Sequence, residues 1–290
     1  MTSPTRTRGA KRLSSYELGR TPFFAARCDQ RFSYCLYVPD NYDPAGTATY
    51  PLAVIVHGTR RTAQRYRDKF AAFGRAHDCI VLAPLFPCGI IEPGELNNYK
   101  HIKFYDIRFD LLLLAMIDEV AERYRVHAER FLLHGFSGGG QFAHRFFYLH
   151  PARLMGVSIG APGTVTLLDP DRDWWCGIRD IEQQFDRSLD YDRLREVPVQ
   201  TVIGANDTET WQITIRRESR LWMEGANDAG RTRRERLEAL ATSFERAGLR
   251  VRHDVVPGVG HNGLKVLEPV KAFFAETLAS RCAGAAISGA

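Results

Sequence analysis

The sequence lacks the features that mark membrane-spanning and metal-binding proteins. No apolar run in its 290 residues approaches the roughly 18 residues that a membrane-spanning helix needs, so we expect no membrane partner. The six cysteines are scattered without the spacing of metal ligands, and we expect free thiols in a reducing cytoplasm. A disulfide between Cys28 and Cys35, facing each other across a hairpin, is the alternative.

Lysine is also scarce, and the basic residues carry no sign of nucleic-acid binding. Only six of the 39 basic residues are lysine, and the net charge is +5. The arginine-rich stretch 231–236 has acids interspersed, which favours the solvated face of a helix over a site for an anionic substrate. No nucleic-acid motif accompanies it, so we expect no nucleic-acid partner.

The N-terminal residues do not form a secretory signal. Residues 1–19 are polar and basic without an apolar core, so we expect a cytoplasmic protein, unless a signal has been removed from a secreted precursor. We expect residues 1–20 to be a flexible tail. Residues 21–290 are expected to form one domain, since 44% apolar and 25% charged residues allow a sizeable core.

Short apolar segments alternate with longer segments of helical spacing. We expect strands at 51–58, 79–84, 130–134, 156–161, 199–204 and 251–256, preceded by an antiparallel edge strand at 31–38. Helices are expected at 62–77, 107–124, 141–147, 231–247 and 265–279. This order predicts an α/β fold, with a mostly parallel sheet and helices on both faces. The polar segment 163–196 breaks the alternation and is expected to be a lid-like insertion.

Residues 135–139, Gly-Phe-Ser-Gly-Gly, stand between an expected strand and an expected helix. Strand, G-x-S-x-G and helix in this order are typical of the nucleophile elbow of serine hydrolases. The turn is so tight that the positions two before and two after the serine must lack bulky side chains. The pattern predicts that Ser137 is a nucleophile exposed above the sheet.

A serine hydroxyl needs a base, and the base needs a third group that orients it. His261 follows the last expected strand in a glycine-rich loop, and Asp207 follows the strand before it. Ligands bind at the carboxyl ends of parallel strands, where all three residues fall. We therefore expect Ser137, Asp207 and His261 to act together, in the chain order known for this elbow.

Other residues of the same types are expected to be structural. His261 has eight rival histidines. They include four that fall inside expected strands or on the elbow helix, namely His134, His144, His150 and His253. The rival acids lie in irregular segments, at Asp169, Asp171, Asp173 and Asp228.

The negative charge that develops on a substrate carbonyl needs backbone donors. One donor is expected to be the amide of Gly138, directly after the nucleophile. The second is expected in the loop His57-Gly58-Thr59, from the amide of Thr59. We expect His57 to organise this loop rather than to act as a second base.

These segments resemble the α/β-hydrolase superfamily over residues 30 to about 280. Within it, His57-Gly58-Thr59, the segment 135–142 and Gly260-His261 resemble the polyhydroxybutyrate depolymerase and feruloyl esterase-like group. The resemblance implies an esterase that works by two-step acyl transfer, with no metal or organic cofactor. It implies a small-molecule or oligomeric ester as the substrate.

The sequence says less about the substrate. Aromatic residues near the expected site are candidates for its pocket, namely Trp174, Trp175, Trp211 and Tyr99, although they could equally anchor the lid. Arg216, Arg217 and Arg220 lie close to Asp207 and could bind a substrate carboxylate. Three alternatives stay open: a peptidase or amidase, an acyltransferase, and a ligand-binding protein on the same fold.

Overall fold

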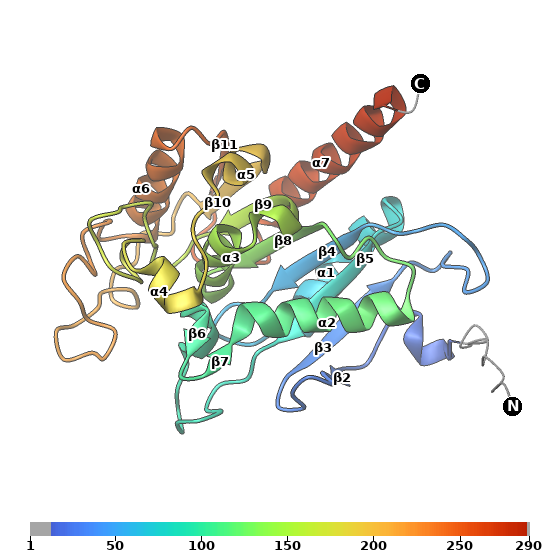
Figure 1. Ribbon diagram of the computed structural model, residues 1–290, viewed down its shortest axis with the longest axis horizontal. Coiled ribbons are helices and arrows are strands. Elements are labelled where there is room, and N and C mark those ends of the chain that lie inside the picture. Colours follow the sequence, from blue (N-terminus) through green and yellow to red (C-terminus); the bar gives the residue numbers. More distant parts are fainter. Residues whose placement is uncertain (1–12, 289–290) are drawn as a thin grey trace, which may run out of the picture.

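A computed structural model describes the backbone of residues 13–288 and the side chains up to residue 280. Its centre is a nine-stranded sheet in the order β1-β3-β5-β4-β8-β9-β10-β11, with β2 also paired to β3 (Figure 1). The strands are β1 (Gly19–Arg20), β2 (Phe24–Ala25), β3 (Ser33–Val38), β4 (Leu52–Val56), β5 (Ile80–Leu85), β8 (Phe131–Phe136), β9 (Leu154–Gly160), β10 (Val199–Gly204) and β11 (Val251–Val256). From β5 to β11 all neighbours are parallel, whereas β3 runs antiparallel to β5.

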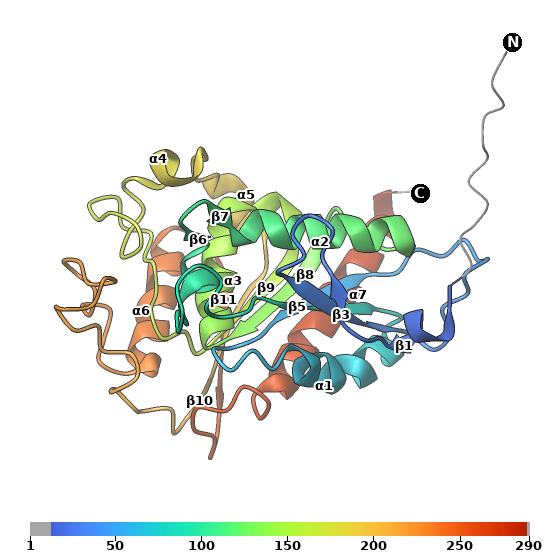
Figure 2. The ribbon, with the colours of Figure 1, turned by 90° about the horizontal axis from the view of Figure 1, so that it is seen from below.

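Helices cover both faces of this sheet, as the alternation predicted. They are α1 (Ala63–Ala76), α2 (Phe109–Arg123), α3 (Gly138–Leu149), α4 (Ile181–Phe185), α5 (Tyr191–Glu196), α6 (Arg233–Arg246) and α7 (Leu267–Ser288). Figure 2 shows α1 and α7 on one face of the sheet and α2 and α3 on the other. Strands β4, β5, β8 and β9 are buried almost throughout, because helices pack on both of their faces. No helix among residues 13–288 is long and apolar enough to span a bilayer.

Two expectations about the N-terminal part are wrong. Residues 13–20 of the expected tail include a 3₁₀ turn at Ser15–Glu17 and strand β1, which pairs with β3 through Gly19 and Arg20. Residues 1–12 of the expected tail lie outside the described residues. Because β1 and β2 pair with β3, this strand is not at the edge of the sheet. Its side chains are buried on both faces from Tyr34 to Val38.

Several short elements after β5 and α3 were also not expected. A 3₁₀ turn at Asn98–His101 (η2) leads into a small hairpin of β6 (Lys103–Phe104) and β7 (Ile107–Arg108). A further 3₁₀ turn at Pro151–Arg153 follows α3. Such elements of two to four residues are too short to carry a periodic pattern. The turn η2 lies against α3, and it matters for the site described below.

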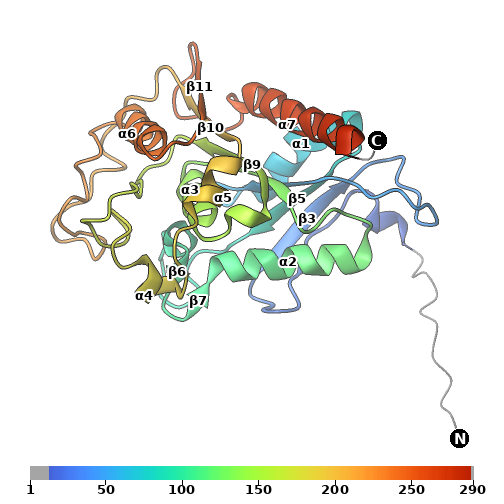
Figure 3. The ribbon, with the colours of Figure 1, turned by 45° about the horizontal axis from the view of Figure 1, so that its top comes forward.

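The long segments after β9 and β10 gather at one end of the sheet. Residues 161–180 and 205–232 lie side by side at the left of Figure 1, and the same neighbours appear in Figure 3. The first overlaps the segment 163–196 that the sequence singled out as an insertion. The remainder of that segment contains α4 and α5. The segments 161–180 and 205–232 cover the edge of the sheet that is formed by the carboxyl ends of β9 and β10.

The central strand β8 carries a buried histidine whose titration affects the stability of the fold in acid. His134 is fully buried, and its Nδ1 lies 3.0 Å from Ser158 Oγ. Burial lowers the pKa of His134 to about 3. In the unfolded chain this histidine is protonated below about pH 6.5, whereas in the folded protein it stays neutral down to about pH 3. The free energy of unfolding therefore decreases as the pH falls through this range.

We predict that His134→Leu weakens the dependence of stability on pH. The free energy of unfolding of wild type should fall more steeply between pH 6 and pH 4, by up to about 1.4 kcal/mol per pH unit from this one group. Urea titrations of both proteins across this range measure the difference. Equal slopes would mean that His134 titrates alike in the folded and unfolded states.

Candidate active site

Ser137 lies in a strained turn between β8 and α3. Its backbone has φ 58° and ψ −113°, a conformation that residues with a side chain rarely adopt. The flanking glycines make the turn possible: a Cβ on Gly135 would lie 2.1 Å from the carbonyl oxygen of Gly139. A Cβ on Gly139 would lie 2.3 Å from the carbonyl oxygen of Val56 at the end of β4. The elbow therefore has the geometry that its sequence predicted.

The structure brings Ser137, His261 and Asp207 together from three different loops. His261 Nε2 lies 3.0 Å from Ser137 Oγ, and His261 Nδ1 lies 2.6 Å from Asp207 Oδ2. Asp207 is buried, with 1% of its surface exposed, while His261 keeps one ring face against Phe136 at 4.9 Å between ring centroids. The carboxylate can hold the proton on Nδ1, which leaves Nε2 free to accept the proton of the serine.

Backbone hydrogen bonds hold the loops that carry these side chains. The amide of Asn206, next to Asp207, donates to the carbonyl of Val259 in the loop of His261, at 2.8 Å. The amide of Ser137 donates to the carbonyl of Gly160 at the end of β9, also at 2.8 Å. Each loop is thus tied to a neighbouring strand end or loop, so the spacing between the three side chains is set by the sheet.

Arg233 is a part of the site that the sequence analysis missed, because it placed the stretch 231–236 on a solvated helix face, whereas Arg233 and Arg236 are buried. Arg233 Nη1 donates to Asp207 Oδ1 at 3.2 Å, and its Nη2 donates to Gln212 Oε1 at 2.8 Å, while 2% of its surface is exposed. Asp207 therefore has one oxygen on His261 and the other on Arg233, which fixes the plane of the carboxylate.

The local sequence explains why Arg233 points there. It is the first residue of α6, which begins with a capping box: Thr232 Oγ1 accepts from the amide of Glu235 at 3.2 Å, and the Glu235 carboxylate accepts from the amide of Thr232 at 3.3 Å. This signal was available in the sequence and marks the start of the helix. Which acid the arginine meets depends on the packing of α6 against the loop after β10.

The four rival histidines and three of the four rival acids make contacts elsewhere, and Asp171 is exposed. His144 donates from Nδ1 to the carbonyl of Gly140 and accepts at Nε2 from the amide of Thr166, and His150 lies 2.7 Å from the buried Asp110. Asp173 pairs with Arg179 at 2.7 Å. Among the described residues, no group of three or more His, Cys, Asp or Glu side chains is arranged to hold a metal ion.

His57 has the surroundings of a residue that organises its loop. It is fully buried, and its Nδ1 donates to the carbonyl of Gly58 at 2.8 Å while Nε2 accepts from the amide of Phe86 at 3.0 Å. Burial lowers the pKa of His57 to about 3, so the ring is neutral near pH 7 and makes the two different hydrogen bonds that the neutral ring allows.

The two amides expected to face a substrate carbonyl lie side by side. The amide nitrogen of Thr59 is 3.3 Å from the position that a Cβ on Gly138 would take. Among the hydrogen bonds of the described residues, none is donated by the amide of Thr59 or of Gly138. Both donors are therefore available at the edge of the sheet that carries Ser137.

The aromatic candidates for a substrate pocket separate into different environments. Tyr99 is buried, and its hydroxyl donates to the carbonyl of His57 at 2.8 Å, which places it next to Gly138. Trp175 is buried too, and its Nε1 donates to the carbonyl of Leu221 at 3.0 Å, which favours the lid-anchoring alternative. Trp174 packs on Phe185 in α4. Trp211 is 73% exposed, and its proposed contact with substrate stays a prediction.

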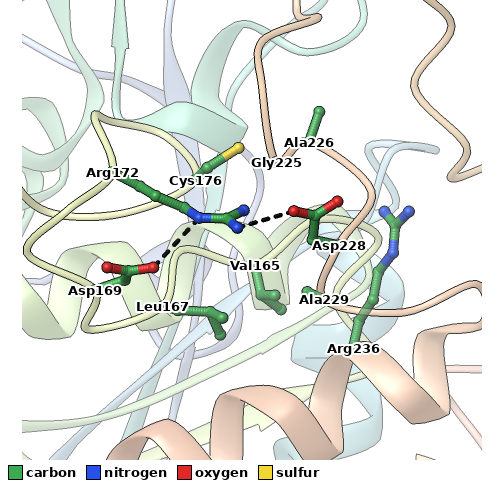
Figure 4. Close-up of a pocket in the computed structure, with 10 residues that line it drawn as sticks. All are labelled: Val165, Leu167, Asp169, Arg172, Cys176, Gly225, Ala226, Asp228, Ala229 and Arg236. Atoms are coloured by element: carbon green, nitrogen blue, oxygen red, sulfur yellow. Dashed lines mark ion pairs between the residues drawn. The ribbon is translucent and has the colours of Figure 1, made fainter.

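A separate cavity of about 190 Å³ lies between the segments after β9 and β10 (Figure 4). Arg172 crosses it, with Nε 3.3 Å from Asp169 and Nη2 2.9 Å from Asp228. Arg236 from α6 also lines it and donates to the carbonyl of Gly163 at 2.5 Å. None of Ser137, Asp207 and His261 lines this cavity, so its charged groups join the two segments rather than form the site.

The cysteines in the described side chains are free. Cys28 is exposed and Cys35 is buried, and no disulfide joins them. The alternative of a bridge across the hairpin is therefore wrong. Burial raises the pKa of Cys35 and Cys176 to about 11, so neither thiol is a reactive thiolate near pH 7.

The sheet order, the elbow after β8 and the site at the carboxyl ends of the strands define an α/β-hydrolase fold. No protein-family model matches the chain, and no curated protein matches it. The solved structures that it resembles include a poly(3-hydroxybutyrate) depolymerase, LpqC, from Bordetella parapertussis, at 24% identity and a TM-score of 0.67, with 84% of this chain and 83% of that chain covered.

Two further structures share the fold. A poly(aspartic acid) hydrolase-1 from Sphingomonas sp. KT-1 is 21% identical with a TM-score of 0.65, over 83% of this chain and 92% of that chain. An S-formylglutathione hydrolase, FrmB, from Staphylococcus aureus is 12% identical with a TM-score of 0.56, over 85% of this chain and 92% of that chain. The expected resemblance to the depolymerase and esterase group is confirmed at the level of the fold.

We predict that Gly135→Ala destabilises the protein and Gly260→Ala does not. The added methyl group at Gly135 would meet a backbone carbonyl at 2.1 Å, whereas at Gly260 the nearest atom is 3.7 Å away. Overpacking of a backbone contact typically costs about 1–3 kcal/mol, so the first variant should unfold at clearly lower urea concentration. If both variants unfold at the same urea concentration as wild type, the tight turn at the elbow is not as rigid as described.

Proposed function

We propose that this protein is a serine hydrolase that cleaves a carboxylic ester through an acyl-enzyme. The observation that carries the proposal is the continuous hydrogen-bonded chain from Ser137 through His261 to the buried Asp207, at 3.0 and 2.6 Å. A protein that only binds ligands has no need for an aligned nucleophile, base and acid on a strained turn. The proposed partner is a small or oligomeric ester, and neither nucleic acid nor membrane takes part.

In the proposed reaction, Ser137 Oγ attacks the carbonyl carbon and its proton moves to His261 Nε2. The amides of Thr59 and Gly138 stabilise the oxyanion of the tetrahedral intermediate. The C–O bond to the alcohol then breaks, and His261 returns the proton to the departing oxygen. A water molecule, deprotonated by His261, then attacks the carbonyl carbon of the acyl-enzyme. The bond from that carbon to Ser137 Oγ breaks, His261 returns its proton to Oγ, and the carboxylic acid leaves.

Asp207 and Arg233 have complementary roles in this proposal. Asp207 keeps the proton on Nδ1 of His261 and stabilises the imidazolium that forms during each step. Arg233 does not touch the reacting atoms; it positions Asp207 by binding the second oxygen of the carboxylate. We regard Arg233 as a positioning residue for that reason.

A second candidate function is cleavage of an amide by the same residues. Its support is the likeness to a protein named as a poly(aspartic acid) hydrolase, since poly(aspartic acid) is joined by amide bonds. The names of other similar structures, a thermostable esterase and a ferulic acid esterase among them, favour an ester. An acyltransferase would differ in passing the acyl group to an alcohol in preference to water.

Removal of the nucleophile is the first test. We predict that Ser137→Ala abolishes release of 4-nitrophenol from the acetate and octanoate esters, because among residues 13–280 no other hydroxyl is hydrogen-bonded to His261. The melting temperature should stay close to that of wild type. Ser188→Ala, at an exposed serine, is the matched control and should keep full activity. Equal turnover by Ser137→Ala and wild type would refute the proposed nucleophile.

Replacement of the acid tests the orientation of His261. In Asp207→Asn the guanidinium of Arg233 can be satisfied only by the amide oxygen, so the NH₂ group turns toward His261 Nδ1. His261 must then accept at Nδ1 and carry its proton on Nε2, where it cannot take the proton of Ser137. We predict a fall in kcat of about 10⁴-fold with unchanged folding. Activity near that of wild type would remove Asp207 from the proposed mechanism.

A further inference from the structure

A buried lysine lies beside the residue that follows the nucleophile. Lys100, in η2, is 6% exposed, and its Nζ donates to Asn97 Oδ1 at 2.7 Å. An ammonium group has three N–H donors, and this is the only hydrogen bond that Nζ makes to the described residues. Two donors of a largely buried cation thus have no partner among the side chains and backbone that the structure describes.

The position of this side chain relates it to the proposed site. A Cβ on Gly138 would lie 3.0 Å from Lys100 Cε and 3.3 Å from the amide nitrogen of Thr59. The end of the lysine therefore borders the same small region as the two amides proposed to bind the oxyanion. The ammonium is one bond beyond Cε, so a substrate group that binds it is a few bonds from the scissile carbonyl.

The charges around Lys100 leave positive charge uncompensated. Lys100 forms no ion pair with a carboxylate of the described residues, and neither does Arg145, which is fully buried. The Arg145 guanidinium donates to neutral oxygens, at 2.8 Å to Thr166 Oγ1 and at 2.7 Å to the carbonyl of Lys100. Arg233 is paired with Asp207, so that carboxylate does not serve the other two cations. Buried charges are ordinarily paired, and a ligand can supply the missing partner.

We propose that Lys100 binds an anionic group of the substrate, so that the ester cleaved carries a carboxylate or similar anion a few bonds from the scissile carbonyl. This inference rests on the proposed function, since it names the substrate class of the same site. Binding would give the ammonium charge-assisted hydrogen bonds to its two free donors. The negative charge of the anion would also compensate the positive charge of the buried Arg145.

The arginines that the sequence analysis considered for this role are placed less well. Arg216 and Arg217 are exposed, and the guanidinium of Arg217 lies over the ring of Trp222. Arg220 already pairs with Glu92 at 2.7 Å. Binding a carboxylate contributes little free energy when the cation is exposed and already paired or solvated. It contributes much more when the cation is buried and has free donors.

The pKa of Lys100 provides a second readout. Burial lowers it to about 8, with Arg61, Arg145 and Arg233 acting in the same direction and Glu95 against them. These groups, with His57 and His101, are the charged or titratable groups that face it, and burial lowers the pKa of both histidines, so both rings are neutral near pH 7. Lys100 is therefore cationic at pH 7 and loses its proton as the pH rises through 8 to 9.5, while a substrate carboxylate stays ionised.

Two pairs of esters that differ in one charge test the proposal. Mono-4-nitrophenyl adipate is compared with 4-nitrophenyl hexanoate for a charge on the acyl side, and 4-carboxyphenyl acetate with phenyl acetate for a charge on the alcohol side. The quantity measured is the ratio of kcat/KM for the charged ester to that for the neutral ester. Lys100→Met keeps the length of the side chain, and Lys103→Met removes a charge from an exposed lysine three residues on as the control.

We expect this ratio to fall about 10- to 100-fold in Lys100→Met for one of the two pairs, the range for loss of a charged hydrogen bond. It should stay unchanged in Lys103→Met, and in wild type it should fall as the pH is raised from 7 to 9.5. A loss of activity that is equal for charged and neutral esters, with the ratio constant, would overturn the proposal and leave Lys100 a structural or oxyanion-binding residue.

Other outcomes are equally decisive. If Lys100→Met does not fold, the pH dependence of the ratio in wild type still decides, and a ratio that is independent of pH contradicts the proposal. If wild type cleaves the neutral esters with no change of the ratio in any variant, the hydrolase stands and the role of Lys100 fails. If none of the four esters is cleaved, the proposed function itself fails, and this inference falls with it.

Discussion

The site depends on the close approach of the N-terminus of α3 to the ends of two strands, β4 and β9. A Cβ on Gly139 would lie 2.3 Å from the carbonyl oxygen of Val56, and a Cβ on Gly140 would lie 2.3 Å from that of Gly160. Only hydrogen atoms fit into these contacts, so the helix can press its first turn against β4 and β9. Ser137 is then held in a backbone conformation that projects its hydroxyl away from the sheet.

That contact also sets what surrounds the nucleophile. With α3 pressed against β4, Gly138 comes to lie beside Thr59 in the loop after β4 and beside Tyr99 and Lys100 in η2. The strained turn, the amides proposed to bind an oxyanion and the buried ammonium are therefore parts of one arrangement. A bulkier residue at 135 or 139 would disturb all of them together, because the backbone has no room to move aside.

Electrostatics distinguishes the two sides of the site. On one side, Asp207 is buried between His261 and Arg233, so its charge is balanced and its orientation is fixed. On the other side, Lys100 and Arg145 are buried with neutral oxygen partners. One half is thus complete in the protein alone, and the other half has the character of a site whose counter-charge comes with the ligand.

The sequence by itself determined the order along the chain of the main strands and helices, the elbow at Ser137 and the loops that hold Asp207 and His261. These features depend on local patterns: apolar runs, helical spacing, and glycines where a turn is tight. The pairing of residues 19–20 with β3, the contact of Arg233 with Asp207, and the burial of Lys100 beside Gly138 were decided only by the tertiary structure. Each joins segments 15 or more residues apart, and no local pattern records which distant group a side chain will meet.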